Sequence, residues 1–185
     1  VYYRHPNTCT RSRASTSRSP STSKADWPME KIKTTEGDVV VRDARYAIVA
    51  ARFNDFIVDS LLKASVHCLR QHGAADADIE IIRVPGSFEM PLAVDKVAAS
   101  RRFDGVIALG AVIRGGTPHF DYVAGQCVRG IGAAASKHGV PVGFGVLTVD
   151  TIEQAIERAG TKAGNKGEEA TLAVIEMVNT LRRLE

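Results

Sequence analysis

Hydrophobic residues beyond residue 45 fall into two alternating patterns: short continuous apolar runs, and longer stretches with apolar positions three or four residues apart. The first pattern is typical of strands buried on both faces, and the second of amphipathic helices. The apolar runs predict four strands, at residues 46–51, 79–84, 105–113 and 142–147. Gly, Pro, Asn or Asp follows each run closely, as expected where a strand ends.

A helical pattern follows each predicted strand. Asn54 or Asp55 can cap the first helix, because short polar side chains accept hydrogen bonds from free helix N–H groups. Its buried face is expected to comprise Ile57, Leu61, Ala64 and Cys68. The second helix is predicted to begin near Glu89, and the third lies behind His119. Two further helices complete the chain, the first at residues 152–159.

Four consecutive strand–helix units predict an α/β fold. Parallel strands joined by helices form a doubly wound, three-layer α/β/α sandwich around a four-stranded parallel sheet. Residues 38–43, Asp-Val-Val-Val-Arg-Asp, form a further strand-like stretch before the sandwich. This N-terminal stretch is a candidate edge strand for pairing with a neighbouring subunit.

Residues 1–28 differ in composition from the rest of the chain. Ser, Thr, Arg and Pro dominate and no hydrophobic periodicity is present, so the segment is predicted to be disordered. An acid-poor, Arg- and Ser-rich leader is compatible with an organellar transit peptide. The alternative, which we favour, is upstream sequence outside the native domain, with Met29 as a natural start. We expect residues 1–36 to lie outside the fold and residues 37–185 to form one domain.

The net charge of +3 is unevenly distributed. Residues 1–28 carry five basic residues and one acidic residue, which leaves −1 for the remainder of the chain. The predicted domain therefore has no basic footprint for nucleic acid. No apolar run approaches the roughly 20 residues that span a bilayer. These features favour a protein that binds neither nucleic acid nor membranes.

The chain contains three cysteines, Cys9, Cys68 and Cys127, and no Cys-x-x-Cys pair. An odd number without such spacing indicates neither a disulfide framework nor a zinc site. Cys68 and Cys127 fall on predicted apolar helix faces and are expected to be buried thiols. A cytoplasmic location is therefore predicted, with an organelle as the alternative if residues 1–28 act as a transit peptide.

The stretch from Gly110 to Tyr122 combines two kinds of chemistry. A buried strand ends at Arg114-Gly115-Gly116-Thr117-Pro118, and His119 introduces a helical pattern. A Gly-rich turn between a strand and a helix exposes N–H groups at a positive helix terminus, which suits an anionic ligand. Because histidine transfers protons near neutral pH, the sequence predicts an anion site beside an acid–base group.

Other candidate residues follow the neighbouring strands. Phe53-Asn54 comes after the first strand, and Ser87-Phe88-Glu89 after the second. In a parallel α/β sheet, ligands bind beyond the carboxyl ends of the strands. These turns are therefore predicted to converge with the Gly-rich turn on one site.

Each candidate residue also has a purely structural interpretation. Phe53 is either a hydrophobic staple against its own helix or a stacking platform for a flat heterocycle. Glu89 either favours the N-terminus of its helix through the dipole or accepts hydrogen bonds from ligand hydroxyls. His119 is either a helix-cap residue or a proton-transfer residue. Arg158 and Lys166, taken alone, are interpreted as solvated surface charges.

Five segments occur in one order and spacing over residues 40–185. They are Ala51–Asn54, Val84–Pro91, Gly110–Val123, Val142–Thr148 and Ile156–Gly167. Together they resemble the 6,7-dimethyl-8-ribityllumazine synthase family, and a chance match to all five is not credible. Residues 1–36 lie outside the resemblance. Pro118 departs from the family pattern, in which many relatives carry Thr, and its missing N–H puts the phosphate cradle in question.

The resemblance implies a flavodoxin-like fold and a transferase of riboflavin biosynthesis. In this reaction 5-amino-6-(D-ribitylamino)uracil condenses with 3,4-dihydroxy-2-butanone 4-phosphate to give 6,7-dimethyl-8-ribityllumazine, phosphate and water. The family uses no metal, nucleotide or redox cofactor. Imine formation, phosphate elimination and ring closure need positioning and proton transfer more than a strong nucleophile.

The resemblance also implies roles for individual residues. Those implied to contact the ribitylaminouracil are Phe53, Asn54, Ser87, Phe88, Glu89, Ala111, Val112, Ile113 and Phe144. Those implied to hold the phosphate of the four-carbon substrate are Gly116, Thr117 and Arg158. His119 is implied to transfer protons, and Lys166 matches a position near the site. Phe144 and Arg158 are implied to reach the site from the adjacent subunit.

The implied assembly is a homopentamer whose active sites are shared between adjacent subunits. In many members, pentamers close into an icosahedral 60-mer shell, and the compact connection at residues 160–167 favours the shell here. Riboflavin synthase is a further candidate partner. One alternative is a flavodoxin-like module that binds lumazine or flavin without catalysis, although His119 and Arg158 argue against it. Another is a structural shell protein whose residues 1–28 bind nucleic acid.

Overall fold

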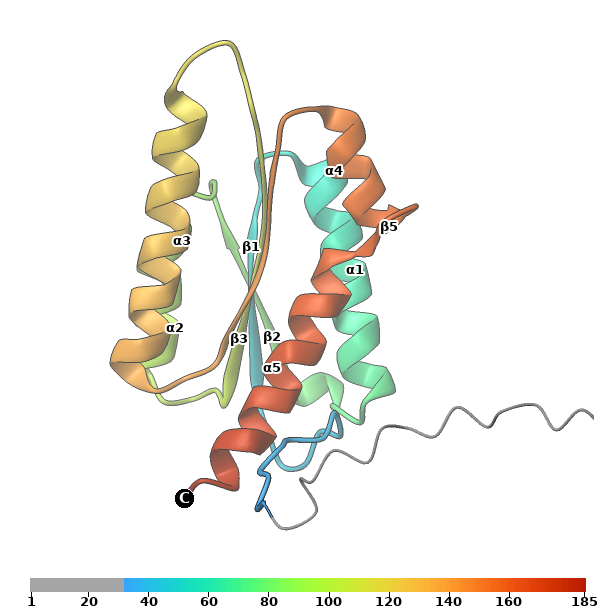
Figure 1. Cartoon of the computed structure of the whole chain (residues 1–185), viewed down its shortest axis with the longest axis vertical. Helices are drawn as coiled ribbons and strands as arrows, with labels where there is room; N and C mark the ends of the chain where they lie inside the picture. Colours follow the sequence, from blue (N-terminus) through green and yellow to red (C-terminus); the bar gives the residue numbers. More distant parts are fainter. Residues whose placement is uncertain (1–31) are drawn as a thin grey trace, which may run out of the picture. The chain divides into compact units, whose positions relative to one another are not determined.

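The computed structural model describes residues 32–185, and the fold is formed by residues 35–185. Residues 1–31, which include Cys9 and most of the predicted N-terminal extension, lie outside the described residues. In the fold, one central sheet is covered by helices on both faces (Figure 1).

The sheet consists of four parallel strands in the order β2-β1-β3-β4. The strands are β1 (Tyr46–Ala51), β2 (Ile79–Val84), β3 (Gly105–Ile113) and β4 (Val142–Val149). The first three match the predicted ranges. The fourth extends beyond its predicted end because Thr148 and Val149 continue the pairing with β3. The predicted parallel α/β class is confirmed.

Helices cover both faces of the sheet. One face carries α1 (Asp55–Gln71), α4 (Ile152–Arg158) and α5 (Lys166–Arg182), and the other carries α2 (Met90–Ala99) and α3 (His119–His138) (Figure 1). A short 3-10 turn, η1 (Asp76–Asp78), precedes β2. A small antiparallel hairpin of β5 (Ala159–Thr161) and β6 (Gly164–Asn165) joins α4 to α5, in a connection whose sequence carries no strand pattern.

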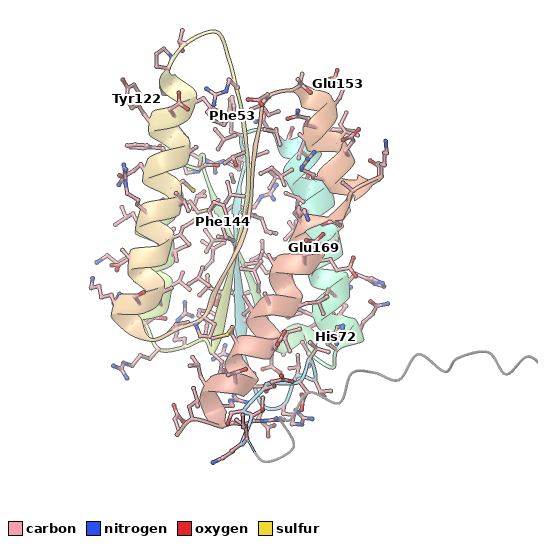
Figure 2. All side chains as sticks on the ribbon, in the orientation of Figure 1. Phe53, His72, Tyr122, Phe144, Glu153 and Glu169 are labelled. Atoms are coloured by element: carbon pink, nitrogen blue, oxygen red, sulfur yellow. The ribbon has the colours of Figure 1, made fainter. Side chains whose placement is uncertain are left out.

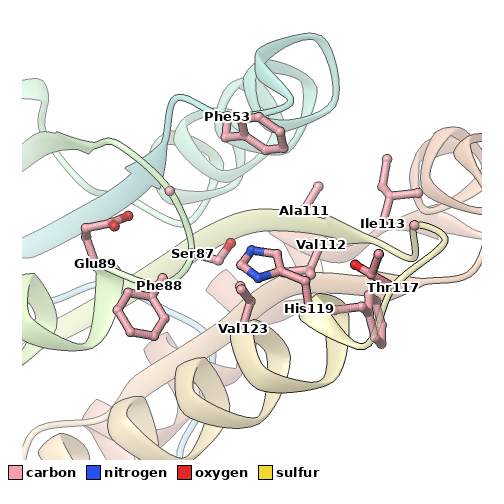
Figure 3. Close-up of a pocket in the computed structure, with 13 residues that line it drawn as sticks. Phe53, Ser87, Phe88, Glu89, Ala111, Val112, Ile113, Thr117, His119 and Val123 are labelled. Carbon is pink, nitrogen blue, oxygen red and sulfur yellow. The ribbon is translucent and has the colours of Figure 1, made fainter.

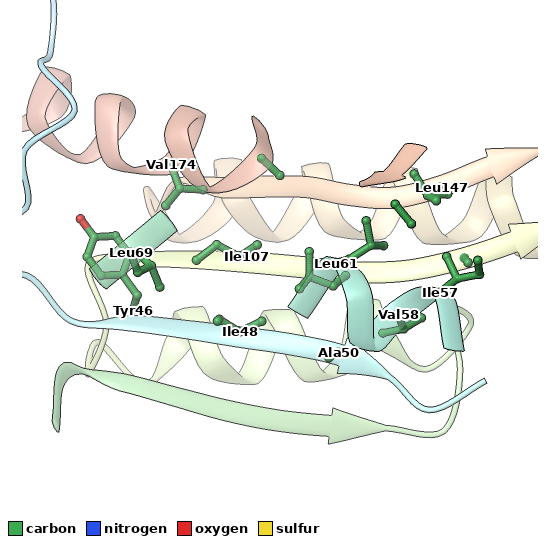
Figure 4. Packing of buried hydrophobic residues seen from close by; sticks show 14 of the residues in the cluster. Tyr46, Ile48, Ala50, Ile57, Val58, Leu61, Leu69, Ile107, Leu147 and Val174 are labelled. Carbon is green, nitrogen blue, oxygen red and sulfur yellow. The ribbon is translucent and has the colours of Figure 1, made fainter. Parts of the chain in front are cut away.

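The sheet separates two hydrophobic clusters. Alternate residues of β1 face opposite sides: Ile48 and Ala50 belong to the cluster beneath α1 and α5 (Figure 4), whereas Ala47 and Val49 belong to the cluster beneath α2 and α3. Fully burying a Val, Leu or Ile side chain contributes about 1.5–3 kcal/mol. Burial on both faces explains why the strands read as continuous apolar runs rather than as alternating ones.

The buried face of α1 differs from the prediction at one position. Ala64 is only partly buried, whereas its neighbour Ser65 is fully buried. The Ser65 hydroxyl hydrogen-bonds to the Thr171 hydroxyl of α5 at 2.6 Å. The two helices pack so closely that a Cβ at Gly167 would lie 2.4 Å from the Leu61 carbonyl oxygen. A small hydrogen-bonded side chain therefore occupies the contact where the apolar pattern predicted alanine.

The predicted capping of α1 is wrong for Asn54, whereas the Asp55 carboxylate accepts a hydrogen bond from the Phe56 N–H of the first turn at 2.8 Å. Asn54 holds the N-cap position in a left-handed conformation (φ 59°), but its side chain makes no cap hydrogen bond. Its Nδ2 instead donates to the Ala111 carbonyl of β3 at 2.9 Å. By contrast, Thr151 and Asn165 cap α4 and α5 through their side-chain oxygens. The Asn54 side chain thus joins two strand ends rather than closing a helix.

Residues 38–43 form no strand within the described chain. Asn179 of α5 donates from Nδ2 to the carbonyls of Asp38 (2.7 Å) and Val40 (2.9 Å). His72, which follows α1, binds the same segment through its ring and through its backbone carbonyl. The segment is therefore tied to the C-terminal ends of α1 and α5 of its own chain. Its pairing with a neighbouring subunit stays a prediction.

Both cysteines within residues 32–185, Cys68 and Cys127, are buried as predicted. Burial raises the pKa of each thiol to about 11, so both are protonated near neutral pH. In the same range, no helix has the length and apolar composition needed to cross a membrane.

Candidate active site

A cavity of about 370 Å³ lies beside the carboxyl end of the sheet (Figure 3). Its walls come from the turns after β1 and β2, the end of β3 and the start of α3. The predicted site residues that line it are Phe53, Ser87, Phe88, Glu89, Ala111, Val112, Ile113, Thr117 and His119. The turns after the first three strands therefore meet at one cavity.

The turn after β1 places Phe53 at the edge of this cavity. The backbone N–H groups of Arg52 and Phe53 donate to the carbonyls of Val84 and Pro85, which ties the end of β1 to the end of β2. The Phe53 side chain is 70% exposed. A hydrophobic staple would be covered by its own helix, so this exposure favours the alternative interpretation of a stacking surface.

The turn after β2 supplies a buried hydroxyl and an aromatic ring. Ser87 is buried, whereas Phe88 beside it is 58% exposed. A Cβ at Gly110 of β3 would lie 2.7 Å from Ser87 Oγ. A residue with a side chain at position 110 would displace this hydroxyl, so the glycine in β3 lets Ser87 reach the cavity.

Glu89 occupies the N-cap position of α2 and lines the cavity. Its carboxylate makes no cap hydrogen bond and is exposed. It stands at the positive end of a helix dipole, where negative charge is favoured. The two interpretations of Glu89 are therefore compatible, because the same carboxylate keeps its acceptor sites available to a ligand.

The Gly-rich turn after β3 has no local need for glycine. Neither Gly115 nor Gly116 has a positive φ, and a Cβ at either would meet nothing within 4 Å. Gly115 and Thr117 line the cavity, whereas Gly116 does not. Missing side chains leave backbone N–H groups open to an approaching anion.

His119 is the first residue of α3. Its ring projects toward Ser87 and Val112 in the middle of the cavity (Figure 3). Pro118, and not His119, holds the N-cap position of α3, so the geometry does not support the helix-cap interpretation of His119. An imidazole in a solvent-accessible cavity is free to exchange protons with a bound ligand.

Five predicted site residues do not line this cavity in the single chain: Asn54 and Gly116, which are next to lining residues, and Phe144, Arg158 and Lys166, which make other contacts. Phe144 of β4 faces a second cavity on the far side of the α3 start. The Arg158 guanidinium donates to the Gln154 carbonyl of its own helix at 3.1 Å. Lys166 pairs with Glu169 at 2.6 Å. The structure therefore does not bring these side chains to the cavity of their own chain.

Gly115, part of the predicted anion turn, also lines the cavity, and three lining residues have no predicted role in the site: Gly86, Phe120 and Val123. Val123 lies four residues after His119 and three after Phe120, so it shares a side of α3 with each of them. That spacing is a signal which the helical pattern already contained.

No group of three His, Cys, Asp or Glu side chains arranged to hold a metal ion is found among residues 32–185. The polar groups around the cavity are instead a hydroxyl, a carboxylate, an imidazole and backbone N–H groups. These groups can bind an anion, accept hydrogen bonds from hydroxyls and move protons.

A parallel sheet with such a cavity at its carboxyl edge defines an α/β enzyme that acts on small molecules. The model of a family described as 6,7-dimethyl-8-ribityllumazine synthase matches residues 43–182. A 6,7-dimethyl-8-ribityllumazine synthase from Halorhodospira halophila is 60% identical over 155 residues, which cover 83% of this chain and 99% of that relative. The chain belongs to the 6,7-dimethyl-8-ribityllumazine synthase family, and the resemblance seen in the sequence is confirmed.

Proposed function

We propose that this chain catalyses the last step in making 6,7-dimethyl-8-ribityllumazine. The substrates are 5-amino-6-(D-ribitylamino)uracil and 3,4-dihydroxy-2-butanone 4-phosphate, and phosphate and water are released. The observation that carries the proposal is one cavity with Phe53, Glu89 and His119 on its walls, in a chain of this family. Aromatic surface, hydroxyl acceptor and proton-transfer group are what the two substrates require.

The ribitylaminouracil is proposed to bind across the ends of the first three strands. Phe53 offers a face for the flat pyrimidine, and the β3 backbone from Ala111 to Ile113 offers groups for its polar edge. Ser87 and Glu89 stand where the ribityl chain would lie, and Glu89 accepts hydrogen bonds from its hydroxyls. Asn54 supports this arrangement by holding the Ala111 carbonyl.

The butanone phosphate is proposed to bind at the start of α3. The N-terminus of this helix and the glycines before it favour an anion, and Thr117 adds a hydroxyl. Gly116 is proposed to contribute its backbone N–H. His119 follows directly, which places an imidazole between the phosphate position and the pyrimidine position. His119 then moves the protons of imine formation and phosphate elimination.

The site is proposed to be completed by the adjacent copy of the chain in a homopentamer. Phe144, Arg158 and Lys166 lie outside the cavity of their own chain. Phe53 and Phe88 leave most of their surfaces exposed at its rim, so an apolar partner surface would be favourable there. Arg158 of the adjacent copy would provide the charge-assisted contact to phosphate. Closure of pentamers into an icosahedral 60-mer shell is the larger assembly that we propose.

The direct test is to incubate the purified protein with both substrates and follow lumazine absorbance and fluorescence. Product formation that saturates in each substrate, with release of inorganic phosphate, is expected. Tight binding of 6,7-dimethyl-8-ribityllumazine without any turnover would instead support the non-catalytic lumazine-binding alternative. The native mass of the same preparation, measured separately, distinguishes a pentamer from a 60-mer shell.

A further inference from the structure

The Gly115–Pro118 loop has little support of its own. In the described chain, Arg114 N–H donates to the Val149 carbonyl before the loop, and Asp121 N–H donates to the Pro118 carbonyl after it. Among residues 32–185, no backbone hydrogen bond outside regular elements involves Gly115, Gly116 or Thr117. Two glycines with open space around them also cost the most conformational entropy to order. The order of the loop therefore depends on contacts made by the residues at its two ends.

The Arg114 side chain bridges both ends of this loop. Its Nε donates to Asp150 Oδ1 at 2.8 Å, and its two amino groups donate to the two carboxylate oxygens of Asp121 at 3.2 and 3.3 Å. Asp121 lies in the first turn of α3, and Asp150 lies in the turn between β4 and α4. One guanidinium therefore connects the end of β3 to two other elements.

The same guanidinium stacks on Phe120, with Cζ 4.1 Å from the ring centroid. Phe120 lines the candidate site on one side, and on the other side it lines the second cavity, which also contains Arg114 and Phe144. Phe120 thus separates the two cavities, and Arg114 packs against its ring from the side of the second cavity. Figure 2 shows Tyr122 near the start of α3 and Phe144 farther along the sheet.

An isolated exposed ion pair contributes little to stability. Arg114 differs because it combines a bidentate carboxylate pair, a second carboxylate and an aromatic stack. A planar guanidinium satisfies all three at once, whereas an ammonium group does not. The arrangement is therefore suited to fixing geometry.

We propose that Arg114 is a positioning residue that holds the Gly115–Pro118 loop and His119 in the geometry that the butanone phosphate requires. The inference rests on the proposed function, because that function assigns the phosphate to this loop. Arg114 acts through Asp121 and Phe120 and does not itself touch the substrate. The ribitylaminouracil is held mainly by residues of other turns, so its binding does not depend on Arg114.

The test compares Arg114→Gln with the wild-type protein and with Arg102→Gln. Arg102 is a matched control, because it pairs with Glu80 at 3.2 Å and its Cζ lies 4.8 Å from the Phe103 ring centroid, away from the candidate site. For Arg114→Gln, kcat/KM for the butanone phosphate is expected to fall about tenfold, because small displacements of catalytic groups are costly. KM for the ribitylaminouracil should stay within about twofold of the wild-type value, and Arg102→Gln should change neither.

A second measurement needs no catalysis. Hydrogen exchange of a peptide covering residues 114–123 should be faster in Arg114→Gln than in the wild-type protein, and unchanged in Arg102→Gln. If Arg114→Gln does not fold, Asp121→Asn carries the same test, because it weakens the bidentate pair and leaves Arg114 in place. Asp121→Asn should show the same selective effect on the butanone phosphate.

Three results would overturn the proposal: an equal rise in KM for both substrates, unchanged exchange in residues 114–123, or a change in native mass that accounts for the lost activity. An inactive wild-type protein would contradict the proposed function instead. The exchange experiment would still decide whether Arg114 holds the loop.

Discussion

The two ends of the sheet differ in whether their polar groups are paired within the chain. At the end opposite the cavity, residues 36–43 are held by Asn179 and Arg182 of α5 and by Arg183, which follows the helix. At the carboxyl end, the Gly115–Thr117 backbone, the Glu89 carboxylate and the Phe53 ring remain open. One end satisfies its hydrogen bonds within the chain, and the other leaves them available to ligands. The difference separates residues that maintain the fold from residues that act on substrate.

The largest expected effect concerns activity at the open end. His119→Ala should lower turnover without unfolding the protein, because it removes the ionisable ring from the cavity. General acid–base groups typically contribute about 10²–10⁴-fold, and a loss at or below the low end is expected, since the condensation proceeds slowly without a catalyst. Turnover measured at saturating substrates tests the loss of activity, and a urea unfolding curve tests whether the variant is folded. Unchanged turnover in a folded variant would remove His119 from the proton-transfer role.

The next prediction compares one asparagine from each end of the sheet. Asn179→Ala removes a buried amide that donates to the carbonyls of Asp38 and Val40. The free energy of unfolding should therefore fall by about 1–3 kcal/mol. Asn54→Gly removes the bond to Ala111 and keeps the left-handed backbone, which glycine adopts without strain. It should raise KM for the ribitylaminouracil.

Each of these two variants serves as the control for the other. Asn179→Ala should leave both KM values unchanged once the protein is folded, and denaturant titration together with steady-state kinetics measures both properties. If Asn179→Ala altered substrate binding as strongly as Asn54→Gly, the division of labour between the two ends would be wrong.

The smallest effect concerns pH. A hydrogen bond from Arg42, another from the Val40 N–H and the nearby Arg183 lower the pKa of Asp38 below its usual 3.8. Because the folded pKa is depressed, the stabilisation is present above pH 3.8 and is lost as the pH falls through the folded value. The urea midpoint of the wild-type protein should therefore fall more steeply below pH 4 than that of Asp38→Asn. Parallel curves for the two proteins would exclude Asp38 as the titrating group.

Most of the fold could be predicted because two-sided burial produces continuous apolar strands and helical spacing between them. The ends of β1, β2 and β3 were correct for this reason. The sequence does not reveal the role of the Asn54 side chain, because an asparagine between a strand and a helix can either cap that helix or bond to a neighbouring strand. Here it bonds to the Ala111 carbonyl of β3. Ser65 was missed because its burial depends on Thr171, a partner 106 residues away.

The candidate site was partly predictable for a different reason. Parallel strands bring their carboxyl ends together, so residues after each strand had to converge once the sheet was predicted. The position of Phe120 between two cavities could not be predicted, because it depends on the direction in which α3 starts after the loop. The Arg114 bridge was missed because Asp121 and Asp150 carry no pattern that distinguishes them from surface charges.

The central claim is that the open end of one chain is completed by Arg158 of the next. The direct measurement is to unfold His119→Ala and Arg158→Ala together, reassemble them, confirm mixing by mass and assay at subsaturating butanone phosphate. Random mixing should place an intact His119 beside an intact Arg158 at about a quarter of the interfaces. The account predicts activity above the average of the two parent proteins. Activity no higher than that average would mean that each chain carries its own complete site.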